Sequence, residues 1–261
     1  MKSGAPLPYI PGMRHEVHGL ADFYSTPAGL VAARLLRERL RAFWPALPGQ
    51  SVLGLGYASP FLRLWHPRGG PAGEGGRAAA RCIALVPPHL PPWRWPRKAA
   101  SCTALAEEDA LPFPDLAFDR ILLVHGLETA DNARRLLREA WRVLKDDGRL
   151  LVVAPNRLGL WAQVEGTPFG QGQPYSHGQL EALLRRQMFR VERRGAALYV
   201  PPFRSRLLLR GAGAWERIGP AVYPRFAGLV LMEAEKDLFA GLPVTEAKAA
   251  ARRRVVVPES V

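Results

Sequence analysis

A glycine turn after an apolar run is the feature of this chain best suited to bind a ligand. Residues 51–60 read Ser-Val-Leu-Gly-Leu-Gly-Tyr-Ala-Ser-Pro, and Val52 to Leu55 has the composition of a strand. A glycine directly after a strand lets the backbone approach a ligand without an intervening Cβ. The motif therefore favours a nucleotide-type binding turn at Gly56, and simple punctuation of the chain is the alternative.

His125 is the second candidate for chemistry. It follows the apolar run from Phe118 to Val124. An imidazole exchanges protons near neutral pH, so it suits a general base or a substrate contact. A hydrogen-bonded histidine at the end of a strand explains the same position equally well.

Indole rings alternate with arginines in the segment Trp93-Arg94-Trp95-Pro96-Arg97. Such a segment stacks on bases or on a protein partner. The alternative is that it fastens a proline-rich loop to the body of the protein. Further arginines predict a positive face, with ordinary solvation as its default role: these are Arg185, Arg186, Arg190, Arg193, Arg194, Arg204, Arg206 and Arg210.

Strands and helices alternate along the chain and must position these residues. Strands are predicted at 52–55, 82–86, 103–105, 118–124, 149–154, 191–200 and 228–235. Helices are predicted after Ser25-Thr26-Pro27, at 61–65, after a cap at Asp131, after a capping box at Ser176 to Gln179, and at 204–218. The alternation predicts a doubly wound, Rossmann-like α/β fold with a mainly parallel sheet. The strand at 118–124 should be central.

The predicted domain organisation is a loose N-terminal arm at residues 1–19, one α/β domain at 20–241 and a basic tail at 242–261. Residues 155–175 are rich in glycine and proline and follow a strand. A segment of that length suggests a lid that contributes Trp161, Tyr175 or His177 to a pocket.

The formal net charge of +13 is compatible with binding of nucleic acid, of an anionic membrane surface or of an anionic substrate. It is equally compatible with no more than an arginine-rich composition.

No run approaches the ~18 apolar residues that a membrane span needs, and the first residues are not expected to be a secretory signal. Cys82 and Cys102 are outside any CxxC spacing and are expected to be free thiols, which fits a cytoplasmic protein. No His/Cys cluster predicts a metal site.

A longer pattern runs from Asp109 to Asn156. It reads Asp-Ala-Leu-Pro-Phe-Pro-Asp, then Phe-Asp-Arg-Ile-Leu-Leu-Val-His over 118–125, then Leu-Arg-Glu-Ala, Arg-Val-Leu, Asp-Gly-Arg-Leu and Pro-Asn. With the turn at Gly56, this block resembles the class I S-adenosylmethionine-dependent methyltransferases, in particular the small-molecule group often labelled type 11. The resemblance covers about residues 50–156.

The resemblance implies a seven-stranded sheet with an antiparallel last strand and S-adenosylmethionine bound across the carboxyl ends of the first four strands. The cofactor contacts that it implies are Gly54, Gly56, Tyr57, Glu107 and Asp109, and it places His125 near the sulfonium. Glu107 stands near the carboxylate that commonly meets the adenine amine. For Glu107 and Asp109, a solvated loop pair is an alternative.

The chain departs from the family pattern at two places. The family usually has a carboxylate at the end of strand two for the ribose hydroxyls, but here Leu85-Val86-Pro87-Pro88 stands there, and residues 75–106 contain no Asp or Glu. Ala58 and Pro60 replace two glycines of the turn. A weakened cofactor site is therefore expected.

Two functions remain open from the sequence. The first is methyl transfer from S-adenosylmethionine to a small molecule, for which an anionic acceptor suits the charge. The second is a non-catalytic protein of the same fold that binds a protein or RNA partner through its basic surface. Nucleic-acid binding is expected to be weak and non-specific.

Overall fold

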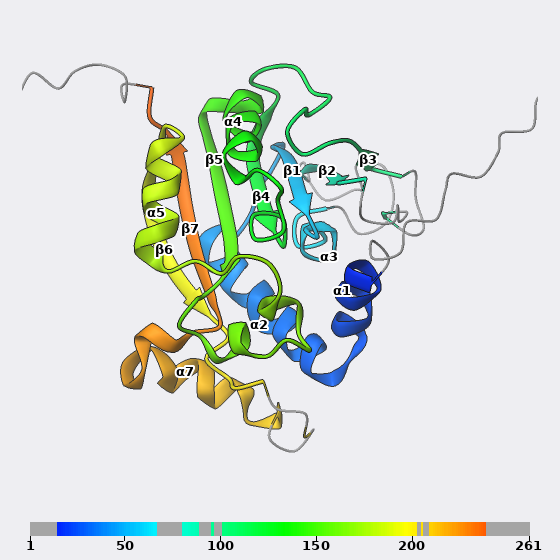
Figure 1. The fold of residues 1–261 in the computed structure, drawn as a ribbon. Helices are drawn as coiled ribbons and strands as arrows, with labels where there is room; N and C mark the ends of the chain where they lie inside the picture. Colours follow the sequence, from blue (N-terminus) through cyan, green and yellow to red (C-terminus); the bar gives the residue numbers. More distant parts are fainter. Residues whose placement is uncertain are drawn as a thin grey trace, which may run out of the picture.

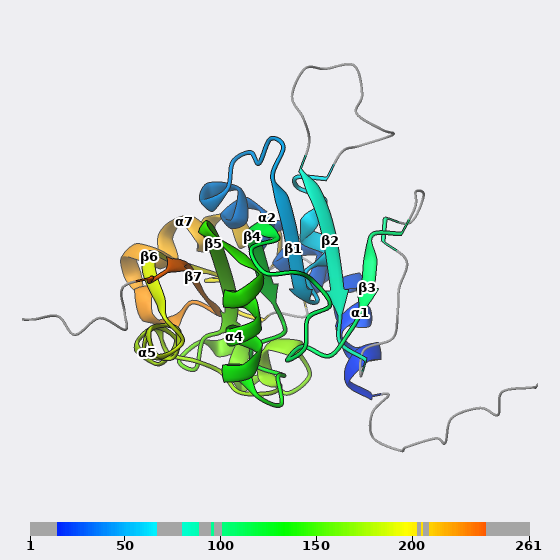
Figure 2. The ribbon, with the colours of Figure 1, turned by 90° about the horizontal axis from the view of Figure 1, so that it is seen from above.

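A single sheet with helices on both faces forms the protein (Figures 1 and 2). The structure is a computed structural model that describes residues 15–66, 80–88, 95–96, 101–202, 205 and 209–238, with side chains from residue 19 onward. The predicted segment 67–76, most of the Trp/Arg segment and the basic tail lie outside these residues.

Seven strands make up the sheet: β1 (Ser51–Gly56), β2 (Arg81–Val86), β3 (Thr103–Leu105), β4 (Phe118–Val124), β5 (Leu144–Pro155), β6 (Phe189–Ala197) and β7 (Leu229–Lys236). Their order is β3-β2-β1-β4-β5-β7-β6, so β4 is central, as predicted. β7 runs antiparallel to β5 and β6, and the other pairs are parallel. The predicted Rossmann-like fold class is confirmed.

The helices are α1 (His15–Ser25), α2 (Pro27–Phe43), α3 (Ser59–Leu62), α4 (Ala133–Val143), α5 (His177–Arg186) and α7 (Ala212–Val222), with 3-10 turns η1 (Leu160–Gln163), η2 (Pro168–Gly170) and η3 (Pro224–Phe226). One hydrophobic core joins α1, α2 and α3 to one face of the sheet, and a second joins α4 and α5 to the other. The parallel strands are buried on both faces for this reason.

Side-chain caps set three helix starts. Thr26 accepts a hydrogen bond from the Gly29 amide at 3.0 Å, and Ser176 and Gln179 form a complete capping box; both caps were predicted. The prediction of an Asp131 cap is wrong. Asn132 accepts from the Arg135 amide at 3.2 Å and caps α4, whereas the Asp131 amide donates to Glu108.

Most predicted boundaries differ from the structure by a few residues, and three of the differences are larger or change an element. α1 begins at His15, so residues 15–19 are helical, whereas an arm was expected there. β5 continues through Asp147-Gly148, and its register with β4 shifts between Phe118 and Arg120 to accommodate the extra residues. The predicted helix at 204–218 corresponds to α7 from Ala212, while much of its first part lies outside the described residues.

Arg142 on α4 fastens the loop between β3 and β4. Its guanidinium donates to the Leu111 and Phe113 carbonyls at 2.9 and 2.8 Å, and to Glu139 and Asp115 at 2.7 Å each. Charge-assisted bonds of this kind are stronger than neutral ones. The Leu-Pro-Phe-Pro-Asp and Arg-Glu-Ala motifs therefore belong to one structural clamp.

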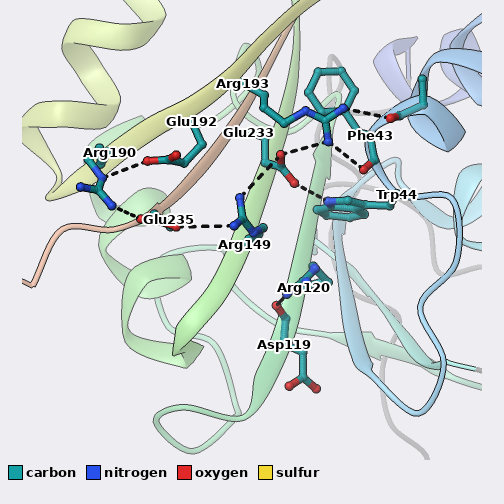
Figure 3. Close-up of polar contacts among 11 residues, drawn as sticks. Phe43, Trp44, Asp119, Arg120, Arg149, Arg190, Glu192, Arg193, Glu233 and Glu235 are labelled. Atoms are coloured by element: carbon teal, nitrogen blue, oxygen red, sulfur yellow. Dashed lines mark hydrogen bonds and ion pairs between the residues drawn. The ribbon is translucent and has the colours of Figure 1, made fainter.

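A buried carboxylate joins the last strand to α2 at the amino ends of the parallel strands (Figure 3). Glu233 is 2% exposed and accepts a hydrogen bond from the Trp44 indole at 2.7 Å. Arg193 lies 3.4 Å from the same carboxylate and also donates to the Phe43 carbonyl at 3.0 Å. Arg149 completes the group at 3.8 Å. These partners offset the free-energy cost of burying the charged Glu233 carboxylate.

The substitution Arg142→Met should lower the free energy of unfolding by about 2–3 kcal/mol, because several charge-assisted hydrogen bonds to the loop are lost together. Urea unfolding followed by circular dichroism measures the change. Arg138→Met on the same helix is the control, since Arg138 is exposed, and should stay within about 0.5 kcal/mol of wild type. Equal effects of the two substitutions would contradict the clamp.

Candidate functional site

The turn after β1 packs directly against the end of β4. Gly56 has φ +70°, and a Cβ added there would lie 2.5 Å from the Val124 carbonyl oxygen and 2.9 Å from the Gly126 Cα. The Tyr57 amide donates to the same Val124 oxygen at 2.7 Å. The glycine at 56 is therefore required by contact between two backbones, a reason that the sequence did not reveal.

Gly54 has a similar structural reason. A Cβ at this position would lie 2.7 Å from Leu62 Cδ1 and 2.9 Å from Ala58 Cβ. The absent side chain makes room for α3 against the sheet. Because residue 54 has no side chain, the cofactor contact expected at Gly54 would be made by its backbone.

His125 is buried at the end of β4 and is hydrogen-bonded through both ring nitrogens. Its Nε2 lies 2.7 Å from the Tyr24 hydroxyl, and its Nδ1 lies 2.9 Å from Glu128 Oε1. Glu128 is a carboxylate, so it assigns the proton of the neutral ring to Nδ1 and leaves Nε2 to accept from Tyr24. The second oxygen of Glu128 is buried and has no partner among the described residues.

Aromatic rings enclose this histidine. Tyr24 stacks on Tyr57 with 5.4 Å between ring centroids, and Phe169 lies 5.1 Å from the His125 ring. Phe23 packs against Phe169 from α1. Burial, with a contribution from Tyr57, raises the pKa of Tyr24 well above its usual value, so this phenol remains a neutral donor.

Residues 155–175 form a packed wall beside this cluster. Trp161 is 1% exposed, and its indole donates to the Val200 carbonyl at 2.7 Å. Tyr175 is also buried, and its amide donates to Pro155. Of the three lid residues expected from the sequence, His177 alone is half-buried, at the start of α5. Trp161 and Tyr175 are thus fixed in the core, and Phe169 of the same segment contacts His125.

The acidic triplet follows β3. Glu107 is exposed, and Asp109 pairs with Arg135 at 3.3 Å. Glu108, which the sequence analysis passed over, is the perturbed member: burial raises its pKa to about 7, against a smaller opposing effect of the hydrogen bond from Asp131. Its position between Glu107 and Asp109 was the feature of the sequence that could have indicated this residue.

The sheet brings the Gly56 turn, His125 and the acidic triplet to the edge formed by the carboxyl ends of its strands, but the triplet stays apart from the other two. Gly56, Tyr57 and His125 meet where β1 and β4 separate, which is the topological switch point. The acidic triplet lies two strands away, ~10 Å along the edge. Val86 and Pro87 end β2 between them and are buried apolar residues. A ligand that reaches both groups must lie across the carboxyl ends of the strands.

Comparison with known proteins finds methyltransferases of similar sequence and fold. Residues 94–152 match a family model described as "Methyltransferase domain". The chain is 29% identical, over 162 residues, to the ubiquinone/menaquinone biosynthesis C-methyltransferase UbiE of Bordetella parapertussis, covering 54% of this chain and 55% of that protein. Over these residues the chain is therefore similar in sequence to methyltransferases. It spans about half the length of the curated relatives that it matches.

Solved structures of methyltransferases share the fold. A methyltransferase from Thermotoga maritima, described as a possible histamine N-methyltransferase, aligns with a TM-score of 0.56 and 17% identity, covering 85% of this chain and 99% of that chain. A complex between the Haloferax volcanii Trm112 methyltransferase activator and a putative methyltransferase aligns with a TM-score of 0.55 and 15% identity, covering 84% and 97%. These likenesses concern the fold alone.

The residues at this edge fit S-adenosylmethionine in part. The family resemblance places the turn at Gly56 and the residues Glu107 and Asp109 toward the two ends of the cofactor. The end of β2 offers Val86 and Pro87 where a carboxylate would meet the ribose. The fit therefore rests on the backbone of the turn and on the triplet.

The described residues contain neither a candidate membrane span nor a candidate metal site. No helix in the described part of the chain is both long and apolar enough to cross a bilayer. Within the same residues, no group of three or more His, Cys, Asp and Glu side chains is placed to hold a metal ion.

Gly56→Ala should be far more destabilising than Gly49→Ala. Both glycines have φ +70°, but a Cβ at Gly49 meets nothing within 4 Å. Gly49→Ala should cost about 1–2 kcal/mol for the left-handed backbone alone, and Gly56→Ala about 2 kcal/mol more because the β4 backbone must shift. Urea unfolding of both variants is the measurement, and equal losses would show that the turn is loosely packed.

The pKa of Glu108 predicts a pH dependence of stability. Since burial raises this pKa from 4.5 to about 7, the folded protein holds a proton that the unfolded chain releases between these pH values. The free energy of unfolding should therefore fall as pH rises through this window. Glu108→Gln should stabilise the protein more at pH 8 than at pH 5 in urea unfolding. Glu107→Gln is the exposed control and should show no such difference.

Proposed function

We propose that this protein transfers a methyl group from S-adenosylmethionine to a small acceptor, with the cofactor lying across the carboxyl ends of β1 to β4. The observation that carries the proposal is the meeting of the Gly56 turn with His125 at the switch point of a methyltransferase fold. Gly54, Gly56 and Tyr57 are the proposed contacts at one end of the cofactor, and Glu107 and Asp109 those at the other.

The bound cofactor supplies a methyl group already activated by its sulfonium, so positioning and exclusion of water provide much of the rate. The aromatic residues around His125 provide such a dry environment. In this role the Glu128 carboxylate holds His125 Nδ1–H and would stabilise the imidazolium that forms when Nε2 takes a proton from the acceptor. Tyr24 must first release Nε2, since its hydroxyl occupies that atom.

The net charge of +13 supports an anionic acceptor as part of this proposal. Opposite charge raises the local concentration of an anionic substrate at a basic surface. A cytoplasmic location is part of the same proposal.

A second function is favoured by one specific observation. Tyr24 and Phe169 already fill the space around His125, and β2 ends without a ribose carboxylate. A protein of this fold that binds no cofactor and recognises a protein or RNA partner would have the same features. Cofactor binding separates the two functions.

Calorimetric titration with S-adenosylmethionine should give a dissociation constant in the tens of micromolar or weaker, because a charged ribose contact is missing. Glu107→Gln should weaken binding a further several-fold, since the adenine amine loses an ionised acceptor. Glu38→Gln, an exposed carboxylate on α2, is the matched control and should bind as wild type does.

Absence of any binding heat at millimolar cofactor would end the methyltransferase proposal and leave the second function. Submicromolar binding would instead show that other groups replace the missing carboxylate. Loss of affinity in Glu38→Gln equal to that in Glu107→Gln would remove the triplet from the site.

A further inference from the structure

Three arginines, none paired with a carboxylate among the described residues, converge on one cleft beside α2 and α3. Arg37 and Arg41 stand one turn apart on α2, and Arg63 follows α3. With His66 and Trp95 they line a cavity of about 390 Å³, a size typical of small-molecule sites. No Asp or Glu occurs among the described residues that line it.

Several arginines elsewhere in the protein do have carboxylate partners. Arg142, Arg190, Arg193 and Arg194 each pair with a carboxylate. Within the described part of the chain, no carboxylate pairs with any of the three arginines of the cleft. Their like charges repel at short range unless an anion lies between them.

Burial makes the unpaired charge at Arg37 costly. Desolvation, followed by the neighbouring charges of Arg63 and Arg41, lowers the pKa of Arg37 to about 10. The Nε atom of Arg37 and the Nδ1 atom of His66 are both buried and lack a hydrogen-bond partner among the described residues. Buried polar groups are normally satisfied, so this side of the cleft has two polar nitrogens without partners.

The sequence around the cleft has the same charge bias. Between residues 63 and 106 the chain contains one carboxylate, Glu74, and seven basic residues. These are Arg63, Arg68, Arg77, Arg81, Arg94, Arg97 and Lys98. The segment therefore carries a net charge of +6 out of +13 for the whole protein.

We propose that this cleft binds the phosphate group of a small molecule, held by Arg37, Arg41 and Arg63, with the Trp95 ring at its side. Guanidinium groups match the oxygens of phosphate in charge and geometry. Trp95 lies 4.8 Å from the His66 ring and is half-buried, so it offers a face for a planar substituent. The volume of the cavity is that of a small-molecule site, and this favours a small molecule over a nucleic-acid strand. The site does not depend on the proposed methyl transfer.

Titration of the full-length protein with inorganic pyrophosphate and with adenosine monophosphate tests this proposal. Saturable binding of at least one of them is expected in the micromolar to millimolar range, and it should weaken as salt rises. Arg41→Gln and Arg63→Gln should each reduce the affinity at least tenfold, because each removes a charge-assisted bond. Arg138→Gln on α4 removes one exposed positive charge from the other face of the sheet and should leave binding unchanged.

A second measurement avoids any effect of substitution on folding. Phenylglyoxal modifies accessible arginines, and mass spectrometry of the wild-type protein reports each site. Pyrophosphate should slow modification of Arg41 and Arg63 but not of Arg138. No saturable binding at 10 mM pyrophosphate or nucleotide would overturn the proposal, and so would equal protection of all three arginines.

One further outcome would replace the proposed ligand. Binding of a ten-nucleotide single-stranded RNA, without binding of either small anion, would point to a nucleic-acid surface and overturn the small-molecule site.

Discussion

The close contact between Gly56 and the backbone that follows β4 is the constraint on which the candidate site depends. Because no Cβ stands at residue 56, the turn after β1 can lie against Val124 and Gly126. This contact places Tyr57 beside the first residue after β4, which is His125. Tyr57 in turn stacks on Tyr24, and so the position of α1 follows from the same contact. A glycine that resembles a ligand contact in the sequence is thus first a packing requirement.

The arrangement around His125 combines the features of a reactive group and of a core residue. The neighbouring carboxylate fixes the tautomer, and the surrounding rings exclude water, as catalysis requires. The same contacts hold α1 against the sheet through a hydrogen bond that joins residues 101 positions apart. Access of an acceptor to Nε2 would therefore require a movement of α1, so the reactivity of the histidine and the docking of the helix compete for one atom.

Much of the fold could be predicted because the determining signals are local. The apolar run at 118–124, the Thr26 cap and the Ser176–Gln179 capping box depend on a few neighbouring residues, and each stands where the sequence placed it. The cap at Asn132 was missed because Asp131 is an equally good cap by type, and a long-range bond to Glu108 decides between them. The strand through Asp147-Gly148 was missed because the pattern Asp-Gly normally ends a strand.

The site was less predictable because its partners are distant in the sequence. Gly56 and His125 were identified, but nothing local indicates that Tyr24 bonds to His125. The pattern on which the family resemblance depends also contains residues with a structural role. Arg142, Glu139 and Leu111 belong to it, and the structure shows them to be a clamp on a loop. A family pattern of this kind reports the fold more securely than the chemistry.

The buried carboxylate at Glu233 has a consequence for how the chain folds. Its partner Trp44 is 189 residues away, and Arg193 reaches the Phe43 carbonyl across 150. The end of α2 therefore gains its polar partners only after β6 and β7 have been synthesised. Contacts between such distant segments slow folding, because the intervening loop must close before they form. During translation, Phe43 and Trp44 therefore remain without these partners until β6 and β7 have left the ribosome, whereas α1 and α2 can already pack on β1, α3 and β4.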